Sequence, residues 1–101
     1  MEIKLLCREI SLTKVDKNSE HLKTALTGAS YVCTGEIYFD GDDPFPILMH
    51  EIAHIFLYRC GYVVSSYSEE QMCGITGKMT DQLMLENGDD IIVKLKEFAN
   101  G

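Results

Sequence analysis

Two histidines and a glutamate stand at a spacing that suits a metal site. His50 and His54 are four residues apart, and Glu51 follows the first of them. On an α-helix, residues four apart lie one above the other, so both imidazoles can reach the same ion. Glu51 lies about 100° around such a helix and can flank the ion without ligating it. In sites of this kind the metal lowers the pKa of a bound water to about 7, and the glutamate takes the proton.

The residues around this group are almost all apolar. Leu48, Ile52, Ile55 and Phe56 leave no broad polar face on the expected helix, so we expect it to be central and to place the two histidines and the glutamate inside. Buried polar groups cost several kcal/mol, on the order of 2–7, unless they are paired or bind a metal. A chance match to the spacing is the alternative, and the apolar surroundings favour the metal site.

A catalytic zinc site takes three protein ligands and keeps one position open, so a third ligand is needed. The third histidine of the chain, His21, lies far upstream, and the position six residues after His54 is Cys60 rather than histidine. A carboxylate on the next helix is the natural choice, with Glu69 and Glu70 as candidates. Glu69 is favoured because it is in register with the apolar stripe of that helix. Either residue could instead simply complement the helix dipole.

The helix that carries the histidines has clear ends in the sequence. Asp43 is expected to act as its N-cap, with Pro44 at the first helical position. The helix should continue to about Cys60, where Gly61 stops it.

Two more helices are expected after it. Ser66 and Ser68 each begin a capping-box pattern, so the second helix should start near one of them and run to about Glu86, ending at Asn87-Gly88. A short third helix is expected over residues 91–98.

The N-terminal part of the chain has the pattern of short strands. Residues 2–15 alternate approximately between apolar and polar side chains, which predicts two short strands or one bent strand. One or two helical turns are expected between Ser19 and Gly28. Residues 31–33 and 36–40 then form a predicted hairpin. Together, these strand and helix patterns predict a single α+β domain over residues 1–101, with an antiparallel sheet of three or four strands followed by the three helices.

Composition limits the possible partners. The formal net charge is −7 and the nine basic residues are scattered, so no nucleic-acid partner is expected. We expect no membrane span, and the charged N-terminus does not read as a signal peptide, so a cytoplasmic protein is expected. The four cysteines form no Cys-x-x-Cys pair and are expected to be free and buried; they are Cys7, Cys33, Cys60 and Cys73.

Residues 36–40, 50–54 and 68–72, together with the start 1–5, resemble the small phage- and prophage-encoded zinc metallopeptidase-like proteins related to the ImmA/IrrE type. The resemblance implies a gluzincin-like fold with Zn²⁺ as cofactor and a protein or peptide as substrate. It implies that the two histidines and a glutamate of the second helix are ligands and that Glu51 is the general base.

Two further features could serve peptide hydrolysis. The strand at 36–40 could hold an extended peptide beside the metal, although an ordinary sheet strand is an equal alternative. Tyr58, Tyr62 and Tyr67 are candidates to stabilise an oxyanion, although a tyrosine in such a position is more often simply an amphipathic surface aromatic.

One departure from the related proteins favours a second function. Those proteins often carry an acidic or amide residue four positions after the ligand, where it can support a histidine; the position is Cys73 counted from Glu69 and Gly74 counted from Glu70. Together with the small size, this leaves open a zinc-stabilised binding or regulatory protein with little or no proteolytic activity.

Overall fold

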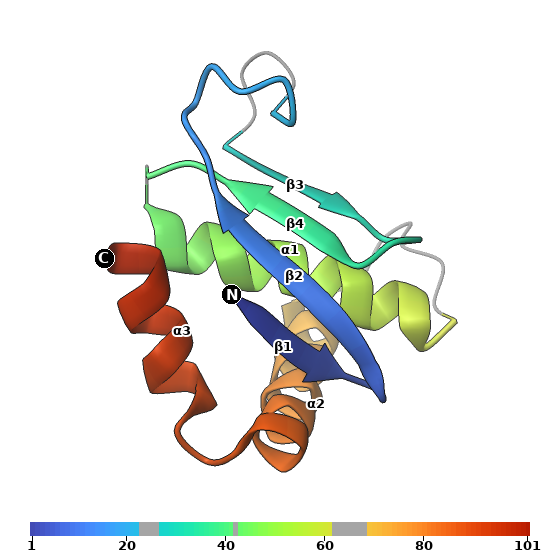
Figure 1. The fold of residues 1–101 in the computed structure, drawn as a ribbon. Coiled ribbons are helices and arrows are strands. Elements are labelled where there is room, and N and C mark those ends of the chain that lie inside the picture. Colours follow the sequence, from blue (N-terminus) through green and yellow to red (C-terminus); the bar gives the residue numbers. More distant parts are fainter. Residues whose placement is uncertain (23–26, 42, 62–68) are drawn as a thin grey trace.

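The computed structural model describes residues 1–22, 27–41, 43–61 and 69–101, with the backbone alone for residues 69–73. Four strands come first in the chain and three helices follow (Figure 1). The predicted α+β class is therefore confirmed.

The four strands form one sheet in the order β1-β2-β4-β3. Their bounds are β1 (Glu2–Leu5), β2 (Arg8–Lys14), β3 (Gly28–Tyr31) and β4 (Glu36–Phe39). β2 and β4 run parallel, whereas the other neighbours are antiparallel. The sheet is thus mixed, and the prediction of an antiparallel sheet is wrong for this pair. The reason is that β3 lies two strand positions from β2, and β4 folds back from β3 to fill the position between them.

The hairpin of β3 and β4 begins earlier than predicted. Gly28 was expected to end a helical segment, but it is the first residue of β3 and pairs with Phe39. The strand ends at Tyr31 and not at residue 33, and residues 32–35 form the turn. Gly35 has a φ of +76°, and its N–H donates to the Tyr31 carbonyl at 2.9 Å. This left-handed conformation suits glycine, which lacks a Cβ.

Helix α1 (Pro44–Arg59) has nearly the predicted bounds. Cys60 is its C-cap, and Gly61 follows with a φ of +80°. Asp43 holds the N-cap position, but its φ of 46° is left-handed and its side chain makes no capping hydrogen bond. The predicted side-chain cap is therefore wrong. Pro44 and Pro46 have no N–H, so fewer donors in the first turn need a partner.

The second and third helices are α2 (Glu69–Asn87) and α3 (Ile91–Asn100). The end of α2 at Asn87, before Gly88 with its φ of +99°, agrees with the prediction. The predicted capping boxes at Ser66 and Ser68 begin outside the described residues. Within the described ranges, no helix combines the length and apolarity that a membrane crossing needs.

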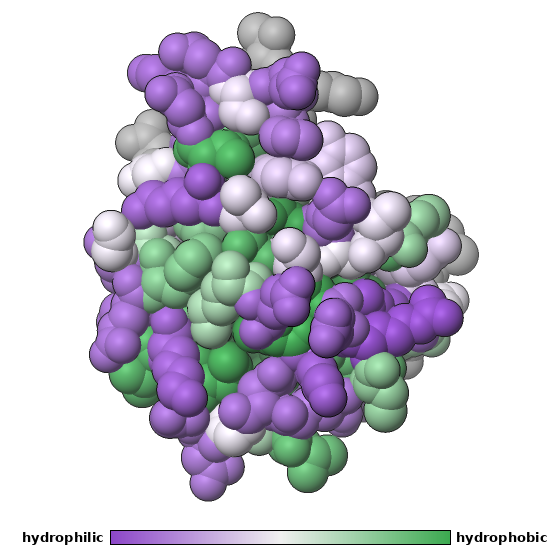
Figure 2. Space-filling view, viewed as in Figure 1, coloured by the Kyte–Doolittle hydropathy of each residue, from purple (hydrophilic) through white to green (hydrophobic). Residues whose placement is uncertain are grey.

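One core joins the sheet to the helices. α1 crosses one face of the sheet, and α2 and α3 lie beside it (Figure 1). The completely buried side chains come from both layers and include Leu12, Ile37, Ile52, Leu83 and Leu95. The face shown in Figure 2 is largely hydrophilic, with apolar residues visible between the polar ones. The helices therefore bury one face of the sheet.

The turn between β1 and β2 has an uncommon backbone. Leu6 and Cys7 have φ values of 56° and 65°, which non-glycine residues rarely adopt. The Glu86 carboxylate accepts both of their N–H groups, at 2.6 and 2.5 Å. The Arg59 guanidinium donates to three carbonyls that flank the turn, those of Leu5, Arg8 and Glu9. One acid from α2 and one base from α1 thus stabilise the turn.

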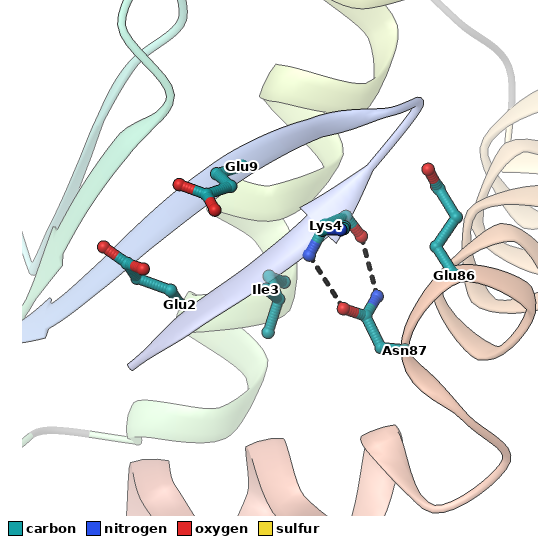
Figure 3. A pocket seen from close by; sticks show the side chains of 6 residues that line it. All are labelled: Glu2, Ile3, Lys4, Glu9, Glu86 and Asn87. Carbon is teal, nitrogen blue, oxygen red and sulfur yellow. Dashed lines mark hydrogen bonds between the residues drawn. The ribbon is translucent and has the colours of Figure 1, made fainter.

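Asn87 continues this contact along the outer edge of β1. Its side-chain amide accepts the Lys4 N–H and donates to the Lys4 carbonyl, both at 2.7 Å (Figure 3). The two bonds reproduce the pattern that a neighbouring strand would make. Next to them is a shallow pocket of about 300 Å³, lined by Glu2, Ile3, Lys4, Glu9, Glu86 and Asn87.

The cysteines of the described residues are only partly as predicted. Cys7, Cys33 and Cys60 are free, which confirms the absence of a disulfide between them. They are exposed rather than buried, because two lie in turns of the sheet and the third caps a helix. The Cys73 side chain lies outside the described residues.

Replacement of Glu86 by glutamine should change how stability depends on pH. Burial alone would raise the pKa of Glu86, but the N–H groups of Cys7 and Leu6, the Gln82 amide and the charge of Arg59 together lower it. A lowered folded-state pKa adds stability above the ordinary value of 4.5, and this stability is lost as the pH falls through the folded-state pKa.

We therefore expect Glu86→Gln to be less stable than the parent chain at neutral pH and to approach it below pH 4.5. Urea unfolding at a series of pH values measures this. Glu97→Gln, on the exposed surface of α3, is the matched control and should follow the parent chain. If the difference in the free energy of unfolding between Glu86→Gln and the parent chain does not change with pH, the lowered pKa of Glu86 is contradicted.

Candidate metal site

The two histidines of α1 converge on one point. The Nε2 atoms of His50 and His54 are 3.0 Å apart. Two nitrogens at about 2.0–2.1 Å from a tetrahedral zinc would be about 3.3 Å apart, so the rings are close to a ligating arrangement. Possible ligand atoms of His50, Glu51 and His54 all lie within 4.8 Å of one another. This is a group that can bind a metal ion, which would replace the proton that the two rings can share.

The three side chains differ in burial. We expected all of them inside, but His50 is exposed and His54 is half-buried. Glu51 is buried, with 7% of its surface exposed. The prediction is wrong for His50 because the helix face that packs on the sheet is the one with Ile52 and Ile55. The histidines stand at the border between core and solvent, where a bound ion would stay open to water.

Glu51 has a polar atom that no described residue satisfies. Its Oε2 is buried and accepts no hydrogen bond from any described residue. An unpaired buried polar atom costs about 1–3 kcal/mol, and native structures rarely keep one without a reason. The histidine nitrogens lie within ligand distance, so a metal ion with its water would satisfy this oxygen. The donor set fits zinc, which favours imidazole and carboxylate ligands.

Gly28 is a site residue that the sequence did not reveal. A Cβ added there would stand 2.7 Å from Ile47 Cγ2 and 3.1 Å from Glu51 Cγ. The backbone of β3 thus approaches α1 beside the candidate base, and only glycine allows this approach without a shift. The sequence alone predicts a helix stop at Gly28. Its contact with α1 could not be predicted, because it depends on how distant segments of the chain pack together.

The third ligand remains a prediction. Glu69 and Glu70 are the first residues of α2, but their side chains lie outside the described residues. His21 is far from the site. Its ring stacks on Tyr38 with centroids 4.0 Å apart, and Tyr38 alternates along β4 with buried residues that face the helices. His21 therefore lies on the other face of the sheet.

The strand expected to hold a peptide is not at an edge. β4 pairs with β2 on one side and with β3 on the other along its whole length, so the assignment of residues 36–40 to this role is wrong. The edge strands are β1 and β3, and β3 is the one next to β4. It runs beside α1, since Gly28 at its start is close to Glu51 and Cys33 just after its end is close to Tyr58. The edge beside the site therefore belongs to β3.

Tyr58 lies one helical turn after His54, on the same face of α1. Its side chain is 50% exposed, and its hydroxyl lies 3.5 Å from Cys33 Sγ. The hydrogen bond with Cys33 raises the pKa of Tyr58, and the charge of Arg8 opposes that shift. Of the three tyrosines considered for an oxyanion role, Tyr62 and Tyr67 lie outside the described residues.

No family model, no curated protein and no solved structure matches this chain. The case for its function therefore depends on its own residues and their geometry.

Metal binding should depend on the histidine pair. We expect the purified chain to bind one Zn²⁺ or Co²⁺ in equilibrium dialysis, and His54→Ala to weaken that binding by more than about 100-fold because a ligand is lost. His21→Ala is the matched control, since that histidine lies on the other face of the sheet. Equal metal affinity of His54→Ala and the parent chain would contradict the site.

Substitution of Gly28 should disturb the contact between β3 and α1. We expect Gly28→Ala to lower the free energy of unfolding by about 1–3 kcal/mol, because the new methyl group overlaps Ile47 Cγ2. Gly77→Ala is the control: Gly77 is an exposed glycine inside α2 with nothing within 4 Å of the added Cβ. That variant should gain about 0.5–1 kcal/mol. Chemical denaturation measures both, and a stabilised Gly28→Ala would contradict the close approach.

Proposed function

We propose that the chain is a zinc-dependent metallopeptidase, with Glu51 as general base. One observation carries the proposal: a buried carboxylate, one oxygen of which has no hydrogen bond from any described residue, lies beside two converging imidazoles, next to an edge strand. Peptide hydrolysis by a zinc enzyme needs a base, metal ligands and a place for the peptide. The carboxylate, the two imidazoles and the edge strand could supply these three.

The roles of the residues follow from their positions. His50 and His54 would hold the zinc through Nε2, and a glutamate of α2, Glu69 in preference to Glu70, would complete the ligands. The zinc would lower the pKa of a bound water and polarise the scissile carbonyl. Glu51 would accept the proton of that water at its buried carboxylate and pass it to the leaving amine. Its burial would keep bulk water from competing for that oxygen.

The strand β3 would position the substrate. An extended peptide can add to a sheet edge through main-chain hydrogen bonds, which form with any side-chain sequence. Gly28 lets this edge come close to Glu51, so a peptide paired with β3 would pass over the histidines. The sequence resemblance to phage-type zinc metallopeptidase-like proteins supports the same proposal, with a protein as substrate.

A zinc-stabilised binding or regulatory protein is the second candidate. Gly74 is exposed, and a Cβ at this position would contact nothing within 4 Å. If Glu70 is the ligand, no side chain at that position supports a histidine, and such support normally matters for activity.

Glu51→Gln separates the two functions. We expect it to keep one zinc per chain but to lower the rate of cleavage of a quenched-fluorescent peptide mixture by about 10²–10⁴, because the base is lost. Glu97→Gln, an exposed acid on α3, should cleave at the parent rate. Metal content is measured on the same samples. The peptidase proposal fails if the zinc-loaded parent cleaves nothing, or if Glu51→Gln cleaves as fast as the parent.

A further inference from the structure

A pocket lies at the C-terminal end of α1, beyond the histidines. It has a volume of about 420 Å³ and is lined by Leu6, Arg8, Tyr58 and Arg59. Tyr58 follows His54 by four residues, which is about 6 Å along a helix. The pocket therefore lies on the same face of α1 as the two histidines, about one helical turn closer to the C-terminal end of the helix.

The lining of the pocket is basic, although the whole chain carries −7. The Glu86 carboxylate, which binds the N–H groups of Leu6 and Cys7, offsets part of the Arg59 charge, so Arg8 is the main cation of the pocket. Two of its four lining residues are arginines, and none is acidic. Arg59 is already engaged by the backbone carbonyls around the β1–β2 turn. Arg8 is exposed, and its guanidinium makes no hydrogen bond or ion pair with any part of the chain that the structure describes. Its five donors are thus available for a ligand.

A peptide on β3 would lead to this pocket. β3 runs along α1 in one direction, from Gly28 beside Glu51 to Cys33 beside Tyr58. An extended chain advances about 3.3 Å per residue, so a distance of one to two helical turns corresponds to about two to four peptide residues. A side chain at that separation from the histidines would lie near Tyr58, on which the charge of Arg8 acts.

We propose that this pocket binds a carboxylate side chain of the substrate, so that the enzyme prefers peptides with Asp or Glu about two to four residues from the cleaved bond. This inference rests on the proposed peptidase function. A guanidinium matches a carboxylate with two parallel hydrogen bonds, and the neighbouring Arg59 adds to the attraction. Leu6 offers an apolar wall for the methylene groups of the acid. The Tyr58 hydroxyl is engaged by Cys33 and is not needed.

The test compares Glu with Gln in the substrate and Arg with Gln in the protein. The zinc-loaded full chain is given quenched-fluorescent decapeptides in which each position in turn is Glu or Gln. We expect kcat/KM to be roughly tenfold higher for Glu at one or two positions on one side of the cleaved bond. Arg8→Gln should abolish that preference, so that kcat/KM for the Glu peptides falls to the value for the Gln peptides of the same variant. Lys96→Gln, which removes the same charge from the exposed surface of α3, should keep the preference.

A binding measurement distinguishes failure of the pocket from failure of the peptidase. Fluorescence anisotropy with Glu51→Gln protein compares the labelled Glu and Gln decapeptides with and without the added Arg8→Gln change. If the parent cleaves no peptide, the peptidase proposal fails, and tighter binding of the Glu peptide that requires Arg8 would still support the pocket. Equal binding of the two peptides, or an acidic preference that survives Arg8→Gln, overturns the inference.

Discussion

The packing of α1 against the sheet is the interaction on which the rest of the structure depends. Leu48, Ile52 and Ile55 have no exposed surface, and each such side chain contributes about 1.5–3 kcal/mol when fully buried. Their burial sets the rotation of the helix about its axis. With about 100° between successive residues, Glu51 then falls between the buried face and the line of the two histidines. Core packing thus places Glu51 inside and the two histidines at the border between core and solvent.

The C-terminal end of α1 is held by polar contacts. Burial lowers the pKa of Arg59, yet its guanidinium binds three carbonyls, and such charged hydrogen bonds are about twice as strong as neutral ones. Glu86 holds the N–H groups of the same turn from α2. The turn therefore connects α1 with α2 through polar contacts. The position of Arg8, and with it the cationic pocket, depends on this connection.

The features that could be predicted from the sequence are the local ones. The bounds of α1 follow from Pro44 and Gly61, and the convergence of His50 and His54 follows from helix geometry alone. The end of α2 at Asn87 is equally local, since Gly88 marks it. Such features need no knowledge of which segments meet in space.

The features that were missed depend on contacts between distant residues. The parallel pairing of β2 with β4, and the edge position of β3, depend on how the chain between them is routed. The exposure of His50 depends on which side of α1 meets the sheet. Gly28 looks like a helix stop until the approach of Glu51 is known. The choice between Glu69 and Glu70 likewise requires the placement of one helix against another.

The contact between Asn87 and Lys4 affects how this protein behaves at high concentration. Exposed strand edges are templates for sheet growth between molecules, which leads to aggregation. Here a side-chain amide occupies main-chain groups on the outer edge of β1, so an incoming strand would first have to displace it. The sheet therefore has one protected edge, at β1, and its opposite edge, at β3, is the one beside the candidate metal site. This asymmetry directs strand addition toward β3 and away from self-association through β1.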